Sequence, residues 1–233
     1  MTAQSSASSG DRPLAVVLCS GGLDSTVCLA EAVQEFEVAL LHVNYGQRTE
    51  GRELRAFQEL AAHYRIERRL VADVSYLADI GGSSLVDANL PVETGLPVDG
   101  NPVPSTYVPF RNAHILCVAV SWAEVIGAGT LFIGAVEEDG SGYPDCTADF
   151  FEKFNRAASA GTRPDTELTI HTPLITMDKS AIVRRGLELG APLHLTWSCY
   201  TGEHEACGQC ESCRLRLRGF AAAGVDDPIR YAG

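Results

Sequence analysis

The sequence predicts an α/β fold with an open parallel β-sheet and helices on both faces. Two observations predict it. Short, continuously apolar runs rich in β-branched residues recur along the chain, as expected of strands buried on both faces. Segments with helical spacing follow several of these runs, and a repeated strand–helix order implies parallel pairing through right-handed crossovers.

The first strand is expected at Leu14–Cys19, and Ser20–Gly22 interrupts the apolar run. Helical spacing follows over Val27–Glu35. A second buried strand is expected at Val38–Val43, followed by an amphipathic helix at Glu50–Tyr64. Further along we expect a helix at Asn112–Ile126, a strand at Thr130–Val136, a helix at Asp149–Ala160, a strand at Leu168–His171, a helix at Lys179–Leu189 and a weak helix at Arg214–Ala223.

At 233 residues the chain is long enough for one well-buried domain with a small appendage. Residues 1–13 are rich in Ser and Ala and are expected to form a disordered tail. Residues 14–195 are expected to form the α/β domain, and residues 196–233 a C-terminal segment around a cysteine cluster. Within the domain, residues 81–110 are rich in Gly, Pro, Asn and Asp without periodicity, which is typical of a functional loop.

The charge and hydropathy patterns limit the kinds of partner that the protein is expected to bind. The formal net charge is −12, and the densest basic segment, Arg214–Arg218, is short. A small-molecule substrate therefore fits better than nucleic acid, which needs Lys and Arg gathered on one face. The N-terminal residues do not resemble a secretory signal, and no apolar stretch approaches the roughly 20 residues of a membrane helix. We expect a cytoplasmic protein.

The first chemical motif is Ser20-Gly21-Gly22-Leu23-Asp24-Ser25, between a buried strand and a helix. Two glycines let the backbone turn sharply and bring its N–H groups to an anion, and the following helix directs its own free N–H groups to the same place. Asp24 beside phosphate suggests Mg²⁺ between them. The alternative is an ordinary turn in which Ser and Asp cap the helix.

The second motif is Cys199-x7-Cys207-x2-Cys210-x2-Cys213. Four cysteines at this spacing favour one closed, tetrahedral, structural Zn²⁺ site. A pair of disulfides and an iron–sulfur cluster are the alternatives, and a reducing compartment disfavours the first. Cys19, Cys28 and Cys117 lie in apolar runs and are expected in the core, whereas Cys146 remains unassigned.

The hexapeptide resembles the signature of the PP-loop ATP pyrophosphatases, which have an adenine nucleotide alpha hydrolase-like fold. They cleave ATP between the α- and β-phosphates and adenylate a substrate. The resemblance implies that Asp24, Ser20 and Lys179 act in catalysis. It also implies that ATP and its pyrophosphate are bound by Cys19, Ser20, Gly21, Gly22, Leu23, Asp24, Ser25 and Thr26.

Further segments resemble one family over nearly the whole chain, the 7-cyano-7-deazaguanine synthases of the queuosine pathway. They are Asn44–Arg48 (NYGQR), Pro104–Asn112 (PSTYVPFRN), Glu138–Cys146 (EDGSGYPDC), Thr172–Lys179 (TPLITMDK) and Thr196–Tyr200 (TWSCY). Most follow strands, where open parallel sheets bind ligands. The substrate-binding residues expected from these segments are Tyr45, Gln47, Arg48, Tyr107, Arg111, Asn112, Ser141, Tyr143 and Asp145.

Tyr107, Tyr143 and Tyr45 are expected to stack on a flat base. Asp145, Asn112 and Ser141 are expected to bind its edge, and Arg111 and Lys179 to neutralise a carboxylate or the triphosphate. For each residue taken singly, a solvated loop position or a half-buried core aromatic is the alternative.

The resemblance implies that ATP adenylates the carboxyl of 7-carboxy-7-deazaguanine and that ammonia from solution gives the amide. A second ATP then drives formation of the nitrile. The implied partners are this acid and ammonia, in a homodimer with ATP, Mg²⁺ and one Zn²⁺ per chain. No residue is identified as a general base.

The chain departs from the family pattern at three positions, where it has Phe110, Gly140 and Thr147 in place of Gly, an aromatic residue and Arg. Exchange of aromatic volume within one pocket would account for the first two. The alternative function is a relative that stops at the amide or couples the acid to another amine, possibly on a protein. A PP-loop enzyme that modifies tRNA and a non-enzymatic zinc module that senses ATP are further alternatives.

Overall fold

The computed structural model describes residues 12–92, 103–137 and 142–232. Its centre is a five-stranded parallel sheet in the order β3-β2-β1-β4-β5. The strands are β1 (Leu14–Leu18), β2 (Glu37–Asn44), β3 (Arg69–Asp73), β4 (Thr130–Ile133) and β5 (Thr169–His171). This arrangement confirms the fold class expected from the sequence.

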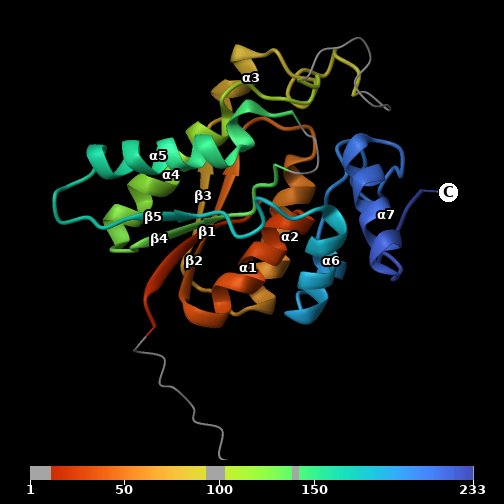
Figure 1. Cartoon of the computed structure of the whole chain (residues 1–233). Helices are drawn as coiled ribbons and strands as arrows, with labels where there is room; N and C mark the ends of the chain where they lie inside the picture. Colours follow the sequence, from red (N-terminus) through yellow and green to blue (C-terminus); the bar gives the residue numbers. More distant parts are fainter. Residues whose placement is uncertain (1–11, 93–102, 138–141, 233) are drawn as a thin grey trace, which may run out of the picture.

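The sheet has helices on both faces (Figure 1). Along β1, Ala15 and Val17 pack toward one face and Val16 and Leu18 toward the other, as the two-residue period of a strand requires. The first face is covered by α1 (Leu23–Glu35), α2 (Glu50–His63), α6 (Lys179–Glu188) and α7 (Glu211–Ala223). The second is covered by α3 (Tyr76–Ile80), α4 (Arg111–Ile126) and α5 (Ala148–Gly161).

The order of the strands fixes where a ligand can bind. From β1 the chain passes outward to β2 and β3, and it then returns to place β4 on the other side of β1. Such a change of direction opens a crevice beyond the carboxyl ends of the two neighbouring strands. The Ser20–Ser25 turn follows β1, and Gly134 follows β4, so both lie at this crevice.

Most expected elements are present, with bounds shifted by a few residues, but β3 and α3 lie outside every expected range. The sequence of β3, RLVAD, contains two charged residues, and its side chains alternate between exposed and half-buried. An edge strand of this kind lacks the continuous apolar run of the central strands. Helix α1 also begins at Leu23 rather than at Val27.

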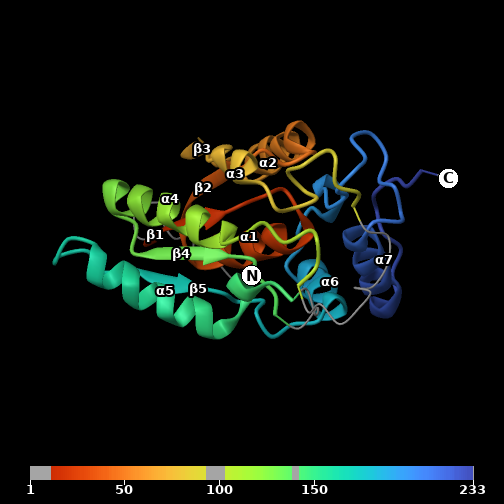
Figure 2. The same ribbon diagram turned by 90° about the horizontal axis from the view of Figure 1, so that it is seen from above.

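Two further regions frame the crevice. In the described part of residues 81–110, Leu85 and Val108 are buried, and Ser84 N–H donates to the carbonyl of Ser105. The C-terminal segment lies beside α6, and α7 packs closely against that helix (Figures 1 and 2). Two short 3-10 helices, Pro144–Cys146 and Leu193–Leu195, connect the remaining elements. None of the helices in the described residues is long and apolar enough to span a membrane.

Candidate active site and metal centre

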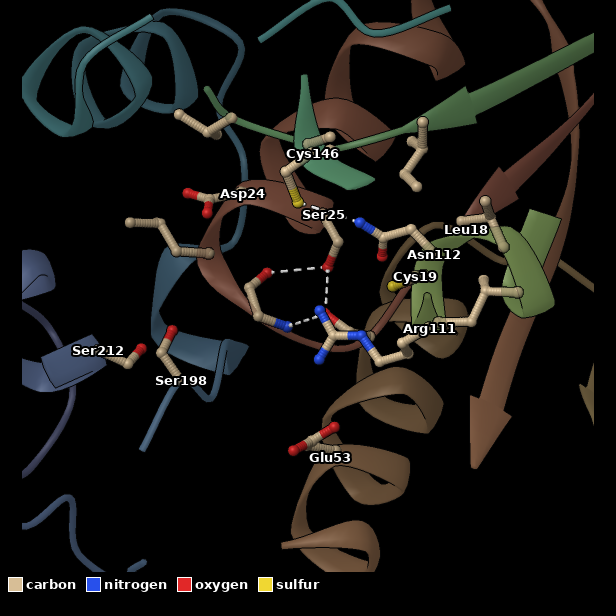
Figure 3. Close-up of a pocket in the computed structure, with 18 of the residues that line it drawn as sticks. Leu18, Cys19, Asp24, Ser25, Glu53, Arg111, Asn112, Cys146, Ser198 and Ser212 are labelled. Carbon is tan, nitrogen blue, oxygen red and sulfur yellow. Dashed lines mark hydrogen bonds between the residues drawn. The ribbon is translucent and has the colours of Figure 1, made fainter. Parts of the chain in front are cut away.

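A cavity of about 310 Å³ lies at the carboxyl ends of β1, β2 and β4 (Figure 3). Its walls come from the turn after β1 and from the first turns of α2, α4, α6 and α7. The lining residues are Leu18, Cys19, Ser20, Gly22, Leu23, Asp24, Ser25, Leu41, Val43, Tyr45, Glu53, Arg111, Asn112, Ile115, Ile133, Gly134, Ala135, Val136, Tyr143, Cys146, Lys179, Trp197, Ser198, Tyr200, Glu211, Ser212, Leu215 and Arg216.

The turn after β1 has the geometry of an anion-binding loop. Gly21 has a φ of +86°, and a Cβ at this position would lie 2.8 Å from the carbonyl oxygen of Glu53, so only glycine fits. Gly22 is the N-cap of α1 and has no side chain to satisfy the first amides of the helix. Ser20 Oγ lies 3.1 Å from Ser25 Oγ, which places two hydroxyl groups beside those amides.

Gly134, directly after β4, lets α1 approach the sheet. A Cβ on Gly134 would lie 2.8 Å from the carbonyl carbon of Asp24 and 2.9 Å from the Cα of Ser25. The contacted atoms are backbone atoms and cannot rotate away. The position of the anion-binding loop therefore depends on the absence of a side chain at residue 134.

Asp24 forms an ion pair with Lys179, the first residue of α6. Lys179 Nζ lies 2.9 Å from Asp24 Oδ1 and 2.8 Å from Oδ2, and both side chains are partly buried. The aliphatic part of the Lys179 side chain packs directly against Gly219 of α7. The contact is so close that a Cβ on Gly219 would lie 2.5 Å from Lys179 Cγ. Two of the three residues expected to act in catalysis are thus in direct contact. The third, Ser20, lies in the same loop.

Three residues expected to bind substrate meet at the opposite wall. The Arg111 guanidinium lies 5.1 Å from the centroid of the Tyr45 ring and donates a hydrogen bond to the Tyr45 hydroxyl. Burial raises the pKa of Tyr45 to about 12, so its hydroxyl stays protonated. Tyr143 also lines the cavity, and its hydroxyl donates to Thr106 Oγ1 at 2.7 Å. These residues bring aromatic faces and one fixed positive charge to the cavity.

Asn112 and Asp145 are close together, but they bind each other. Asp145 Oδ2 accepts a hydrogen bond from Asn112 N–H, and the Asn112 side-chain amide donates to the Asp145 carbonyl oxygen and to Cys146 Sγ. Asp145 is 3% exposed and does not line the cavity, although Asn112 does. The pair therefore fixes the start of α4 and the 144–146 turn. Its expected use as the edge-binding carboxylate is not supported.

Several other expected residues lie behind the cavity wall. Arg48 donates to the carbonyl oxygens of Asp87 and Leu90, and so it binds the 81–110 loop. Tyr107 accepts a hydrogen bond from Phe110 N–H, with its ring 5.6 Å from that of Tyr143. Gln47, Gly21 and Thr26 also do not line the cavity, and Ser141 lies outside the described residues.

Glu53, in the first turn of α2, is a cavity residue that the sequence did not single out. Its Oε1 accepts from Thr49 Oγ1 at 2.8 Å, and its Oε2 accepts from Gln47 Nε2 at 3.1 Å. Burial raises the pKa of Glu53 to about 7, against the pull of these hydrogen bonds and of Arg111. No local sequence pattern distinguishes it from the other polar residues of this helix. Trp197 and Tyr200 were likewise missed, although both belong to the TWSCY segment.

Cys199, Cys207, Cys210 and Cys213 form a second centre, next to the cavity. Their sulfur atoms all lie within 4.8 Å of one another, and those of Cys207 and Cys213 are 3.9 Å apart. Four sulfurs around Zn²⁺ at the usual bond length would be about 3.8 Å apart. All eight cysteines are free in this structure.

Backbone N–H groups also support a zinc site at these four cysteines. Gly202 N–H and Cys207 N–H donate to Cys199 Sγ, and Cys210 N–H donates to Cys207 Sγ. Donors directed at sulfur stabilise the thiolate form that a metal requires. The four residues therefore fit a zinc ion. Of the remaining cysteines, Cys19 and Cys28 are buried as expected, but Cys117 is exposed on α4, so its expected place in the core is wrong.

Two departures from the family pattern lie outside the cavity. Phe110 is the N-cap of α4 with a φ of +57°, which explains why glycine is favoured there, and its side chain is 56% exposed. Thr147 is the N-cap of α5 and accepts a hydrogen bond from Phe150 N–H. The suggested exchange of aromatic volume within the pocket is therefore not supported for Phe110. Gly140 lies outside the described residues.

The densest basic segment is not a basic surface patch. Arg216, at its centre, is 1% exposed and forms a two-pronged ion pair with Asp227. Its guanidinium also donates to Thr196 Oγ1. Arg216 therefore fastens the C-terminal residues to the start of the cysteine segment, which is a structural role.

Comparison with known proteins agrees with this geometry. The family model described as "Queuosine biosynthesis protein QueC" matches residues 14–224. Similar relatives include proteins named 7-cyano-7-deazaguanine synthase from Chlorobium phaeobacteroides, 58% identical over 218 residues, and Chlorobaculum tepidum, 56% identical over 220 residues. Each alignment covers 93% of this chain and 96% of the relative.

Among solved structures, a predicted tRNA methyltransferase subunit from Methanocaldococcus jannaschii matches with 14% identity and a TM-score of 0.45, over 76% of this chain and 75% of that one. This likeness is too distant to bear on function. The family match, in contrast, covers residues 14–224, which include the loop, the cavity walls and the four cysteines, and the relatives cover 93% of the chain. The chain therefore belongs to the QueC family of queuosine biosynthesis proteins and is an ATP-dependent enzyme of the ligase type.

Proposed function

We propose that the protein converts 7-carboxy-7-deazaguanine, ammonia and ATP into 7-cyano-7-deazaguanine. The observation that carries the proposal is the continuity of the cavity. One space joins the anion-binding loop after β1 to a wall with aromatic rings and Arg111. A nucleotide phosphate and a flat carboxylic acid can therefore bind within reach of each other. The relatives named 7-cyano-7-deazaguanine synthase support the choice of acid.

The loop residues would bind the triphosphate. The free amides at the start of α1 and the hydroxyls of Ser20 and Ser25 would donate to the β- and γ-phosphates, which leave together as pyrophosphate. Lys179 would balance the charge that develops on this leaving group. Mg²⁺, which keeps several waters and binds phosphate oxygens, would need only one protein oxygen here, and Asp24 fits that role.

The reaction would proceed in two rounds. In the first, a carboxylate oxygen attacks the α-phosphorus of ATP, pyrophosphate leaves, and ammonia then displaces AMP from the acyl carbon to give the amide. In the second, the amide oxygen attacks a second ATP and pyrophosphate leaves again. Loss of AMP and of the remaining N–H protons then gives the nitrile. The protein contributes mainly orientation and charge stabilisation.

The test is a product analysis. The protein is incubated with ATP, Mg²⁺, ammonium and 7-carboxy-7-deazaguanine, and the products are identified by mass spectrometry. We expect the nitrile, with two AMP and two pyrophosphate released for each nitrile formed. Accumulation of the amide, or a conjugate when another amine is supplied, would identify the alternative function. Absence of pyrophosphate release with this acid would contradict the proposal.

Two further features complete the proposal. The cysteine centre would hold a structural zinc ion in the reducing cytoplasm, where thiols persist. We include a homodimer in the proposal because large apolar side chains are exposed at this edge of the sheet, Tyr76 and Ile80 on α3 and Val71 on β3. Sedimentation equilibrium would test the dimer, and a monomer at micromolar concentration would contradict it.

A further inference from the structure

Three carboxylates line the cavity, those of Asp24, Glu211 and Glu53. Asp24 is paired with Lys179. Glu211 accepts a hydrogen bond from Thr106 Oγ1 at 3.3 Å. Glu53 accepts hydrogen bonds from the neutral side chains of Thr49 and Gln47, and no Lys, Arg or His of the described residues forms an ion pair with it. A carboxylate in a cavity without a cationic partner is costly unless a ligand supplies donors.

The neighbours of Glu53 hold its carboxylate in one orientation. Thr49 Oγ1 donates to Oε1 and Gln47 Nε2 donates to Oε2, so each oxygen has one protein partner. The Gln47 side chain is fixed in turn, because its Oε1 accepts from Tyr45 N–H at 2.8 Å. Each carboxylate oxygen keeps lone-pair capacity for a further donor. Glu53 is thus an oriented, two-oxygen acceptor at the cavity wall.

A ligand with two adjacent N–H groups complements such an acceptor. The 2-amino-4-oxopyrimidine edge of a guanine-type base presents the ring N1–H and the 2-amino group side by side. The corresponding edge of adenine presents one donor beside a ring nitrogen lone pair, which a carboxylate oxygen would repel. Arg111 lines the same cavity (Figure 3), and its guanidinium would supply donors for the neighbouring ring carbonyl. A carboxylate at this position therefore matches the base of the acid better than the base of ATP.

We propose that the Glu53 carboxylate accepts hydrogen bonds from N1–H and the 2-amino group of the deazaguanine acid, and so determines specificity for a guanine-type base. This inference rests on the proposed substrate. It assigns to Glu53 the role expected of Asp145, whose carboxylate is occupied by Asn112 N–H. Because burial raises the pKa of Glu53 to about 7, the carboxylate is ionised and ready to accept both donors at pH 8.

Calorimetric binding at pH 8 tests the inference. The zinc-loaded protein is saturated with α,β-methylene ATP and titrated with 7-carboxy-7-deazaguanine and with its analogue that lacks the 2-amino group. We expect the wild type to bind the first acid at least ~10-fold more tightly, as for hydrogen bonds to a charged group. Glu53→Gln should bind both acids with similar affinity and leave nucleotide affinity unchanged. Glu50→Gln, on the same turn of α2 but outside the cavity, is the matched control and should retain the preference.

The outcomes separate this inference from the proposed function. Equal binding of both acids by the wild type overturns the inference without reference to any variant. A Glu53→Gln protein that keeps the preference, or that loses nucleotide affinity instead, also overturns it. A Glu53→Gln protein with unchanged binding but slower amide formation would make Glu53 a general base rather than a specificity residue. Failure of the wild type to bind either acid would contradict the proposed substrate itself.

Discussion

Lys179 Nζ lies within 2.9 Å of both carboxylate oxygens of Asp24, although the two residues are 155 positions apart in the sequence. The ion pair connects the start of α1 to the start of α6 at the mouth of the anion-binding loop. It also places one positive and one negative charge where the pyrophosphate would leave.

Asp24→Ala is expected to lower pyrophosphate release at least ~100-fold, because the reaction loses its metal-binding oxygen and Lys179 loses its partner. The ion pair is partly exposed, so the melting temperature should change little. Pyrophosphate release and thermal melting measure the two effects. Lys153→Met, which removes an exposed lysine paired with Asp149 on α5, is the control for loss of an ion pair. Full activity of Asp24→Ala would refute the assigned role.

Gly134→Ala is expected to displace the anion-binding loop, because the added Cβ would lie 2.8 Å from backbone atoms of Asp24. We expect at least a ~10-fold rise in the KM for ATP, together with a lower melting temperature, since overpacking at fixed backbone atoms is destabilising. Gly161→Ala, where a Cβ meets no atom within 4 Å, is the matched control. An unchanged KM for ATP in Gly134→Ala would show that the loop can shift without consequence.

Cys210→Ser is expected to lower zinc content and stability together, because three ligands hold the ion less well than four and the segment has a small core of its own. Metal analysis by mass spectrometry and a thermal melt should change in parallel. Cys117→Ser, at an exposed position, should change neither. A melting temperature equal to that of the wild type, despite lost zinc, would argue against a structural metal.

Asp227→Asn is expected to lower the free energy of unfolding by about 3–5 kcal/mol, because it leaves the buried Arg216 guanidinium without a counter-charge. Urea unfolding measures the change. Asp226→Asn, one residue earlier and exposed, should have an effect within about 0.5 kcal/mol of zero. Equal stabilities of the two variants would mean that the C-terminal ion pair does not anchor the segment.

Glu53→Gln is expected to change how stability depends on pH. The pKa of Glu53 is raised from 4.5 to about 7, so between these pH values the folded protein binds more protons than the unfolded chain. Its contribution to the free energy of unfolding therefore falls as pH rises from about 4.5 to 7. Arg111 and Glu50 face the carboxyl and act in opposite directions on this pKa.

Relative to the wild type, Glu53→Gln should therefore gain stability on going from pH 5 to pH 8. Melting temperatures of both proteins across this range measure the difference. A difference that stays constant between pH 5 and pH 8 would contradict the raised pKa.

The sequence predicted features that depend on local spacing. The loop around Gly21 and the cluster around Cys210 each lie within a short segment, so the residue types and intervals suffice to identify them. Features that depend on packing could not be predicted in this way. Asp145 and Arg48 were expected at the substrate, but each is occupied by backbone partners supplied by distant segments. Glu53 was missed because its exposure to the cavity follows from how α2 packs on Gly21, which no local pattern reveals.

The contact between Gly219 and the Lys179 side chain connects the cysteine cluster to the nucleotide site through helix α7. Helix α7 begins at the cysteine cluster, and its backbone at Gly219 contacts Lys179, which faces the nucleotide site. If a bound zinc ion were removed by a chelator, the first turn of α7 would lose its anchor. Lys179 would then no longer be held in its ion pair with Asp24. The enzyme should thus become inactive on demetallation although no reacting atom would touch the ion, and readdition of metal should restore turnover.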